Sequence, residues 1–116
     1  MLTKQSLAGF TGTTTWYRHW MHSLITYTDG VKYMADEGGA HWLIDEIVFA
    51  QAKVEVAKED FQSWMLVVHT NGSATLTCTD GDENVVFTKQ ISYTDFPLPD
   101  IILYYANKTL YLPSEH

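Results

Sequence analysis

The sequence predicts an α+β domain in which N-terminal helices pack on a four- to five-stranded antiparallel meander sheet. Residues 61–92 contain three runs rich in β-branched and aromatic residues. Asn71-Gly72 and Asp80-Gly81 separate these runs, and both dipeptides favour tight hairpin turns. Before residue 52, apolar residues instead recur at helical spacing. Helices followed by strands are typical of the α+β class.

Length and composition favour a single domain over residues 1–116. A chain of 116 residues has no room for a second core. The hydrophobic fraction of 46% can fill one core, and the aromatic fraction of 14% argues against disorder. No apolar run approaches the roughly 20 residues that span a bilayer, and the first ten residues lack the long apolar region of a secretory signal. Cys78 is the single cysteine, so we expect no intramolecular disulfide and a reduced, cytoplasmic setting.

The first predicted helix covers residues 3–8. Thr3 or Ser6 caps it, because either hydroxyl can accept a hydrogen bond from the first helical turn. Gly9 ends it, since glycine is common just after a helix. The Thr- and Gly-rich residues 11–15 then predict a connecting loop.

The dense aromatic segment at residues 16–22 predicts a second, short helix. Trp16 and Trp20 are four residues apart, which places both rings on one helical face. Residues 24–27 predict a short extended piece after it. The segment therefore belongs to the helical half of the expected fold.

Residues 28–30 allow two interpretations, a hairpin turn or the start of a helix. We favour a helix capped by Thr28 or Asp29 and ended by Gly38-Gly39. Its apolar residues at helical spacing are Val31, Met34 and Ala35.

The clearest helical pattern covers residues 40–51. Its apolar stripe consists of Trp42, Leu43, Ile47 and Ala50, widened by Val48 and Phe49. We expect this helix to be well buried against the sheet. Residues 52–60 predict an extension of the helix or a charged connection.

Strand alternation predicts two different faces of the sheet. Runs at 64–69, 73–79 and 85–92 place apolar residues on one face and a mixture of Thr and apolar residues on the other. A proline-rich break and a last hairpin at 101–112 follow. The second face would carry Met65, Val67, Val86, Tyr104 and Tyr111. If no helix covers that face, it would favour dimerisation or partner binding.

Several phrases along the chain together resemble those of a known family. They are Phe10-Thr-Gly-Thr, Trp16-Tyr-Arg-His, Tyr27-Thr-Asp-Gly-Val-Lys-Tyr, Gly38-Gly-Ala-His-Trp-Leu-Ile-Asp, Leu76-Thr-Cys-Thr-Asp-Gly, Tyr93-Thr-Asp-Phe-Pro-Leu and Leu112-Pro-Ser-Glu-His. The family comprises small proteins of unknown function from bacteria and their phages. The resemblance implies a single small cytosolic domain, often on mobile DNA, and carries over no catalytic residues. At the last position an aromatic residue such as Tyr is expected where this chain has His116, so a packing role there does not carry over.

The strong negative charge restricts the partners. Fourteen carboxylates against seven Lys and Arg residues give a net charge of −7. Such a surface repels nucleic-acid phosphates and anionic membranes, so direct binding to either is disfavoured. It suits a host or cognate protein with a basic surface. Acidity for solubility alone is the simpler alternative.

No motif predicts a metal, a cofactor or a catalytic centre. His19-x-x-His22 and His41-x-x-x-Asp45 each place two possible ligands on one helical face, but histidine clustering alone is a weak criterion. The Asp- and Gly-rich segment 80–84 is explained by a hairpin turn rather than a calcium loop. Cys78 falls on the predicted buried face, where a thiol is usually inert. We therefore predict no bound metal, no cofactor and no catalytic residue.

Residues 16–20 are rich in the residue types that commonly form protein interfaces. Trp, Tyr and Arg commonly anchor protein interfaces, and exposed acids would complement a basic partner. The candidate partner-binding residues are Trp16, Tyr17, Arg18, His19, Trp20, Asp45, Glu46, Asp80, Asp82 and Glu83. Alternatively, Arg18 pairs internally with Asp95 or Asp45, and the Trp rings belong to the core.

These observations favour a non-enzymatic protein–protein interaction module. Given the resemblance, the specific version is a phage or mobile-element inhibitor of a host defence protein, comparable to an anti-CRISPR, whose acids imitate phosphates. It requires an acidic stripe formed by Asp36, Glu37, Asp45, Glu46, Glu59 and Asp60, or by Asp80, Asp82 and Glu83. One alternative is a small ligand-binding or metal-dependent enzyme domain with a pocket between helices and sheet, lined by His41, Arg18 and Tyr residues. The other is a self-associating accessory protein.

Overall fold

The computed structural model describes residues 2–116. Its helices are α1 (Lys4–Ala8), α2 (Asp29–Gly38), α3 (His41–Ala50), α4 (Val54–Ala57) and the 3-10 helix η1 (Pro113–Glu115). Its strands are β1 (Trp16–Arg18), β2 (Thr26–Thr28), β3 (Phe61–Val68), β4 (Ala74–Thr79), β5 (Val85–Ile91), β6 (Asp100–Ala106) and β7 (Thr109–Tyr111). No helix in this part of the chain is long and apolar enough to cross a membrane.

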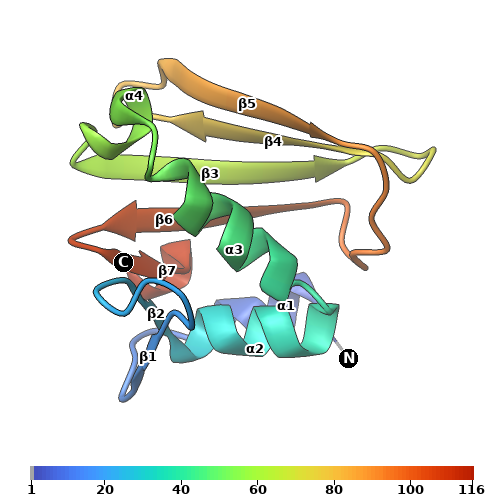
Figure 1. The fold of residues 1–116 in the computed structure, drawn as a ribbon. Helices are drawn as coiled ribbons and strands as arrows, with labels where there is room; N and C mark the ends of the chain where they lie inside the picture. The colour runs from blue at the N-terminus through green and yellow to red at the C-terminus, as the bar shows by residue number, and fades with distance from the viewer. Residues whose placement is uncertain (1) are drawn as a thin grey trace.

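The α+β class is confirmed, but the predicted four- to five-stranded antiparallel meander is wrong. Within residues 2–116 the strands form one seven-stranded sheet with the order β1-β2-β7-β6-β3-β4-β5 (Figure 1). Strand β2 runs parallel to β7, whereas the other neighbours are antiparallel. The sheet is larger than predicted because the N-terminal hairpin joins it through this parallel pair.

The meander itself is confirmed as β3–β4–β5. Its turns fall at the predicted dipeptides, and Gly72 takes the left-handed φ of 89°. In the second turn the left-handed residue is Glu83, with φ 66°, while Asp80 accepts hydrogen bonds from the backbone N–H groups of Asp82 and Asn84. The proline-rich residues 92–99 then carry the chain back to the free edge of β3, where β6 pairs.

The predicted helix at residues 16–22 is wrong, because this segment forms β1 and a loop. Strand β1 pairs antiparallel with β2, with Trp16 opposite Thr28 and Arg18 opposite Thr26. A helix of seven residues is marginal by itself. Aromatic and β-branched residues favour a strand once a neighbouring strand supplies hydrogen bonds. The predicted extended piece at 24–27 corresponds to β2.

The other helices follow their sequence signals. Thr3 caps α1 with its side chain, and Gly9 follows the helix as predicted. Thr28 caps α2 by accepting from the Val31 N–H, and Gly39 ends α2 in the left-handed conformation with φ 61°. The helical interpretation of residues 28–39 is therefore confirmed over the hairpin. The connection at 52–60 contains the separate short helix α4.

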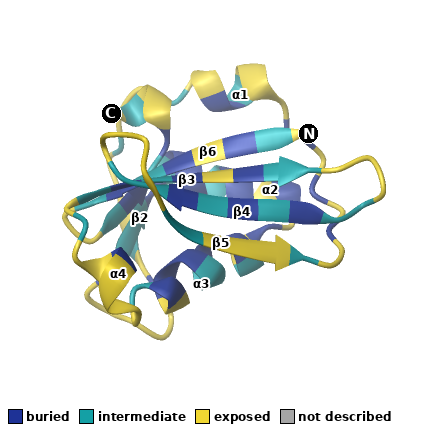
Figure 2. Ribbon diagram, turned by 90° about the horizontal axis from the view of Figure 1, so that it is seen from above, coloured by how far each residue is buried: buried dark blue, intermediate teal, exposed yellow. Residues whose placement is uncertain are grey.

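The sheet has one covered face and one largely open face. Helix α3 crosses the covered face, and the buried core between them includes Trp64, Leu66, Leu76, Leu103 and Ile47 (Figure 1). Viewed from above, the sheet separates α3 and α4 on one side from α1 on the other (Figure 2). Cys78 is buried with the core, as predicted.

We call the second face the open face. It carries Trp16, Arg18, Met65, Tyr104 and Tyr111. Strand pairing places these side chains together, since Tyr104 lies opposite Tyr111 and strands alternate their side chains. Helix α1 reaches only the β6 end of this face, through ion pairing of Lys4 with Asp100. Val86, which was predicted there, instead packs against the core cluster.

The C-terminal turn is attached to the start of α2 by Glu115. Its Oε1 accepts from the Thr28 hydroxyl at 2.7 Å and from the Leu112 N–H at 2.9 Å, and its Oε2 accepts from the Gly30 N–H at 3.3 Å. Gly30 permits this close approach. A Cβ at that position would lie 2.6 Å from Leu112 Cδ1 and 2.7 Å from Glu115 Oε1.

We therefore expect Gly30→Ala to lower the free energy of unfolding by about 1–3 kcal/mol, the usual effect of overpacking. Gly12→Ala is the matched control, because nothing lies within 4 Å of its added Cβ. The control should change stability by less than about 1 kcal/mol. Urea unfolding monitored by circular dichroism measures both, and equal losses would contradict the proposed contact.

Candidate functional site

Strand alternation divides the predicted Trp16–Trp20 cluster between two faces. Trp16 and Arg18 lie on the open face, whereas Tyr17 lies between them in sequence and faces the other way. The Tyr17 ring stacks on Tyr27 at 5.7 Å, and its hydroxyl donates to Asp29 Oδ1 at 3.0 Å. That hydrogen bond raises the pKa of Tyr17, and the Thr14 backbone N–H is the main cause of the lowered pKa of Asp29. Tyr17 therefore has a structural role.

His19 is a buried residue that organises the loop at 19–24. Its Nδ1 accepts hydrogen bonds from the backbone N–H groups of Met21 and His22, both at 3.2 Å. Because Nδ1 is an acceptor, the ring hydrogen is on Nε2, which donates to Asp45 Oδ1 at 2.7 Å. The side chain is only 1% exposed. The ring thus fixes the loop to α3.

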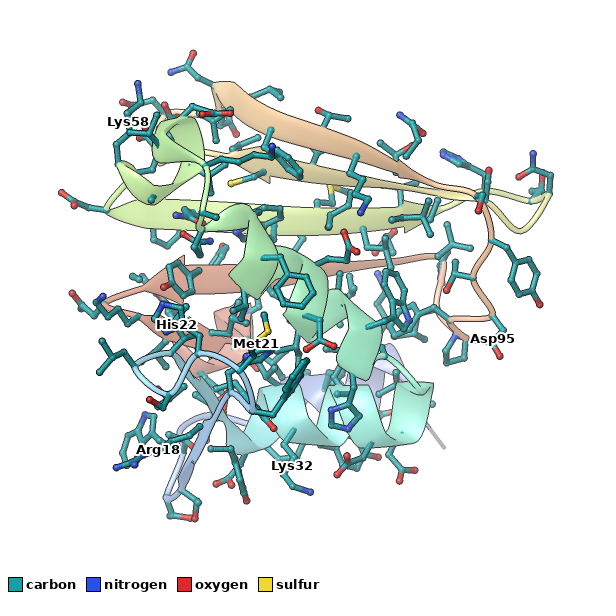
Figure 3. The ribbon with its side chains drawn as sticks, viewed as in Figure 1. Arg18, Met21, His22, Lys32, Lys58 and Asp95 are labelled. Atoms are coloured by element: carbon teal, nitrogen blue, oxygen red, sulfur yellow. The ribbon has the colours of Figure 1, made fainter. Side chains whose placement is uncertain are left out.

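Around His19 the structure exposes four large apolar side chains, Trp20, Met21, Leu24 and Phe49, which we call the loop patch. Trp20 is 73% exposed, yet its indole Nε1 donates to Asp45 Oδ1 at 2.9 Å. Met21 and Phe49 line a hollow of about 440 Å³ between the loop and α3. Figure 3 shows Met21 on the loop in front of the sheet. Trp20 and Phe49 both contact the His19 ring, with centroids 5.6 and 6.3 Å away, and Met21 shares the hollow with Phe49. Exposed apolar side chains that lie together are typical of an interaction surface.

The predicted acidic residues do not form one cluster with the loop patch. Asp45 lies beside the patch, where it accepts from the Trp20 indole, but Glu46 pairs with Lys89 of β5 at 2.6 Å. Asp80 stabilises the β4–β5 turn, and the N–H groups of Asn84 and Asp82 lower its pKa. Asp82 and Glu83 are exposed in that same turn. The acidic residues therefore lie in three separate regions: beside the loop patch, next to β5, and in the β4–β5 turn.

The predicted pocket lined by His41 and Arg18 does not form. His41 Nε2 binds Asp36 Oδ1 at 2.7 Å on the surface of the helical layer, whereas Arg18 lies on the open face. Figure 3 shows Arg18 and Asp95 at opposite ends of the molecule, so the interpretation that they pair is wrong. Asp45 binds His19 and Trp20 instead, and within residues 2–116 Arg18 makes no ion pair.

Neither metal nor thiol chemistry gains support from the described part of the chain. No three His, Cys, Asp or Glu residues there are placed to hold a metal ion together. Burial raises the pKa of the Cys78 thiol to about 12. A thiol with that pKa stays protonated at neutral pH and is a poor nucleophile.

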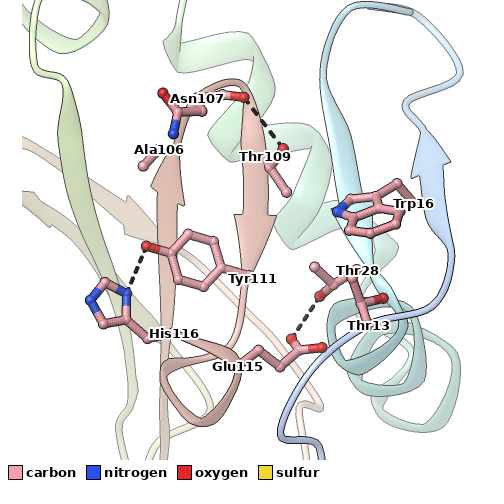
Figure 4. A pocket seen from close by; sticks show the side chains of 9 residues that line it. All are labelled: Thr13, Trp16, Thr28, Ala106, Asn107, Thr109, Tyr111, Glu115 and His116. Carbon is pink, nitrogen blue, oxygen red and sulfur yellow. Dashed lines mark hydrogen bonds between the residues drawn. The ribbon is translucent and has the colours of Figure 1, made fainter.

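Sequence reasoning missed a hollow of about 420 Å³ on the open face, shown in Figure 4. Trp16, Tyr111, Glu115 and His116 contribute to its lining. His116 stacks on Tyr111 with ring centroids 5.6 Å apart and an angle of 9°, and its Nδ1 lies 3.0 Å from the Tyr111 hydroxyl. The last residue therefore packs after all. The closing Leu112–His116 phrase was the available signal, but only the folded sheet brings it to Trp16.

The loop patch was also only partly predicted. Of its four residues, the sequence predicts only Trp20 as a candidate, together with the neighbouring Asp45, and it does not predict Met21, Leu24 or Phe49. The apolar stripe predicts Phe49 on the buried face of its helix, yet this side chain is exposed beside the loop. An apolar helix position next to Val48 gives no sequence signal of exposure.

Fold and surface together define a small α+β protein with a mixed sheet and an exposed apolar loop patch. The whole chain, residues 1–116, matches DUF6876, a family of unknown function, and the protein belongs to that family. No curated protein and no solved structure matches the chain.

The role of His19 can be tested by His19→Ala. This change leaves two backbone N–H groups without their acceptor and removes one of the two donors to Asp45, so we expect it to lower the free energy of unfolding by about 1–3 kcal/mol. His22→Ala in the same loop removes an exposed ring and should cost less than about 0.5 kcal/mol. Urea unfolding of both variants is the measurement. A loss for His22→Ala as large as that for His19→Ala would show that His19 does not organise the loop.

Proposed function

We propose that this protein is a non-enzymatic protein-interaction module whose contact surface is the loop patch. The observation that carries the proposal is the exposure of Trp20, Met21, Leu24 and Phe49 around one fixed loop. Trp and Met are enriched in protein interfaces, and Trp is also enriched among the few residues whose truncation costs about 2 kcal/mol or more of binding energy. The hydrogen bond to Asp45 holds the Trp20 indole in place before a partner arrives. Such preorganisation lowers the entropic cost of binding.

The partner expected for this surface is a host or cognate protein with an apolar recess bordered by basic residues. The net charge of −7 attracts such a surface. Asp45 adds a local contribution, because both hydrogen bonds from His19 and Trp20 go to its Oδ1. Its Oδ2 can therefore accept from a Lys or Arg of the partner.

The loop patch supports binding to an apolar recess of a partner better than it supports imitation of nucleic-acid phosphates. Of the acids required for a helical-side stripe, Asp36 binds Lys32 and His41, and Glu46 binds Lys89. These contacts reduce the negative potential that a phosphate mimic needs. Ionic strength distinguishes the two forms of the proposal, because phosphate mimicry weakens steeply with salt and an apolar contact does not.

The test compares proteins retained from a host lysate by tagged variants. The double substitution Trp20→Ser with Met21→Ser should weaken retention of the partner at least about tenfold, since it truncates the centre of the interface. Tyr93→Ser is the matched control, because Tyr93 is 72% exposed but lies in the 92–99 connection. It should retain the partner as wild type does.

Quantitative mass spectrometry of the retained proteins gives the readout. Circular dichroism of each variant confirms that the fold is intact. Equal retention by wild type and by the double variant, or equal loss in the Tyr93→Ser control, would contradict the assignment of the loop patch.

A further inference from the structure

The hollow in Figure 4 combines aromatic walls with an acidic floor. Trp16 comes from β1 and Tyr111 from β7, and β2 lies between these strands. Two strand spacings of about 4.8 Å each separate their backbones by roughly 10 Å, which leaves room for one flat or compact group between the rings. Trp16 is 57% exposed, so its ring is free to take up a ligand.

Glu115 supplies the negative charge of this hollow. Its Oε1 already accepts two hydrogen bonds, from the Thr28 hydroxyl and the Leu112 N–H, whereas its Oε2 accepts one, from the Gly30 N–H. No Lys, Arg or His within residues 2–116 forms an ion pair with Glu115. The carboxylate therefore keeps one acceptor position and a charge that no side-chain cation neutralises.

The rest of the lining also favours a cation over an anion. Neither Lys nor Arg lines the hollow, and the His116 ring, which does, has its Nδ1 3.0 Å from the Tyr111 hydroxyl. The side chain of Asn107 adds a neutral amide that can accept a hydrogen bond. The volume of about 420 Å³ lies within the usual range for ligand sites. Aromatic rings attract cations that lie over their faces within about 6 Å.

We infer that this hollow binds an organic cation, a guanidinium or ammonium group, between Trp16 and Tyr111 and above Glu115. The inference does not rest on the loop patch, because it uses different residues. The same chemistry could come from a Lys or Arg side chain of a protein or from a free amine such as a polyamine.

The test titrates N-acetyl-arginine amide into ¹⁵N-labelled protein and follows the Trp16 indole N–H by NMR. N-acetyl-citrulline amide is the matched ligand, because it has nearly the same shape without the charge. We expect saturable shifts with the arginine derivative and binding weaker by about five- to thirtyfold with the citrulline derivative, the range of a cation–π contact. Trp16→Leu should weaken arginine binding by a similar factor, followed at the Gly30 amide, whereas Trp20→Leu should leave it unchanged.

Two further arms identify the source of the cation. Tighter binding of an arginine within a Gly/Ser peptide than of free spermidine would assign the site to a protein side chain, and the reverse order would assign it to a free amine. Equal shifts with the arginine and citrulline derivatives, no shifts with either, or unchanged binding by Trp16→Leu would overturn the inference. Because Trp20 is the control here and Trp16 is absent from the loop patch, failure of this site leaves the test of the proposed function intact.

Discussion

Parallel pairing of β2 with β7 connects the two ends of the chain, and both candidate surfaces depend on it. Thr26 and Thr109 are 83 positions apart, yet their hydroxyl oxygens lie 3.1 Å from each other. The Thr26 N–H donates to the Lys108 carbonyl at 2.9 Å, and Glu115 adds its contacts at the start of α2. Closing so long a loop costs conformational entropy that only contacts in the folded state offset. Once it is closed, Trp16 lies across β2 from Tyr111, and the 19–24 loop reaches α3.

Local signals in the sequence were sufficient for the parts of the fold that local chemistry determines. Thr3, Thr28 and Gly39 define helix ends because a hydroxyl can cap a helix and glycine accepts a left-handed φ. The Asn-Gly and Asp-Gly dipeptides also predicted the two meander turns. In the first turn Gly72 takes a left-handed φ, whereas in the second turn Asp80 accepts backbone hydrogen bonds and Glu83 takes the left-handed φ. Strand β1 could not be predicted in this way. It has three residues, and its strand conformation requires β2, which in turn requires β7.

In the candidate site, too, local sequence signals predicted some residues, whereas others depend on tertiary contacts. Residue type alone pointed to Trp20, which is exposed, and to Asp45, which accepts from its indole, but it could not separate Trp16 from Trp20. Strand alternation turns Trp16 to the open face, and the buried His19 then holds the loop so that Trp20 lies beside α3. One short phrase thus supplies two surfaces on opposite sides of the hairpin. Phe49 and His116 belong to these surfaces because of tertiary contacts, which no local sequence pattern predicts.

Amide hydrogen exchange measured residue by residue by NMR tests the parallel β2–β7 pair most directly. If this pair closes the sheet, the Thr26 amide exchanges only in the same cooperative opening as amides of the central pair β3–β6, such as that of Leu66. Protection of Thr26 should therefore approach that of Leu66 and fall with it in mild denaturant. Rapid exchange of Thr26 while Leu66 stays protected would contradict the account, because the N-terminal hairpin would then open independently of the sheet.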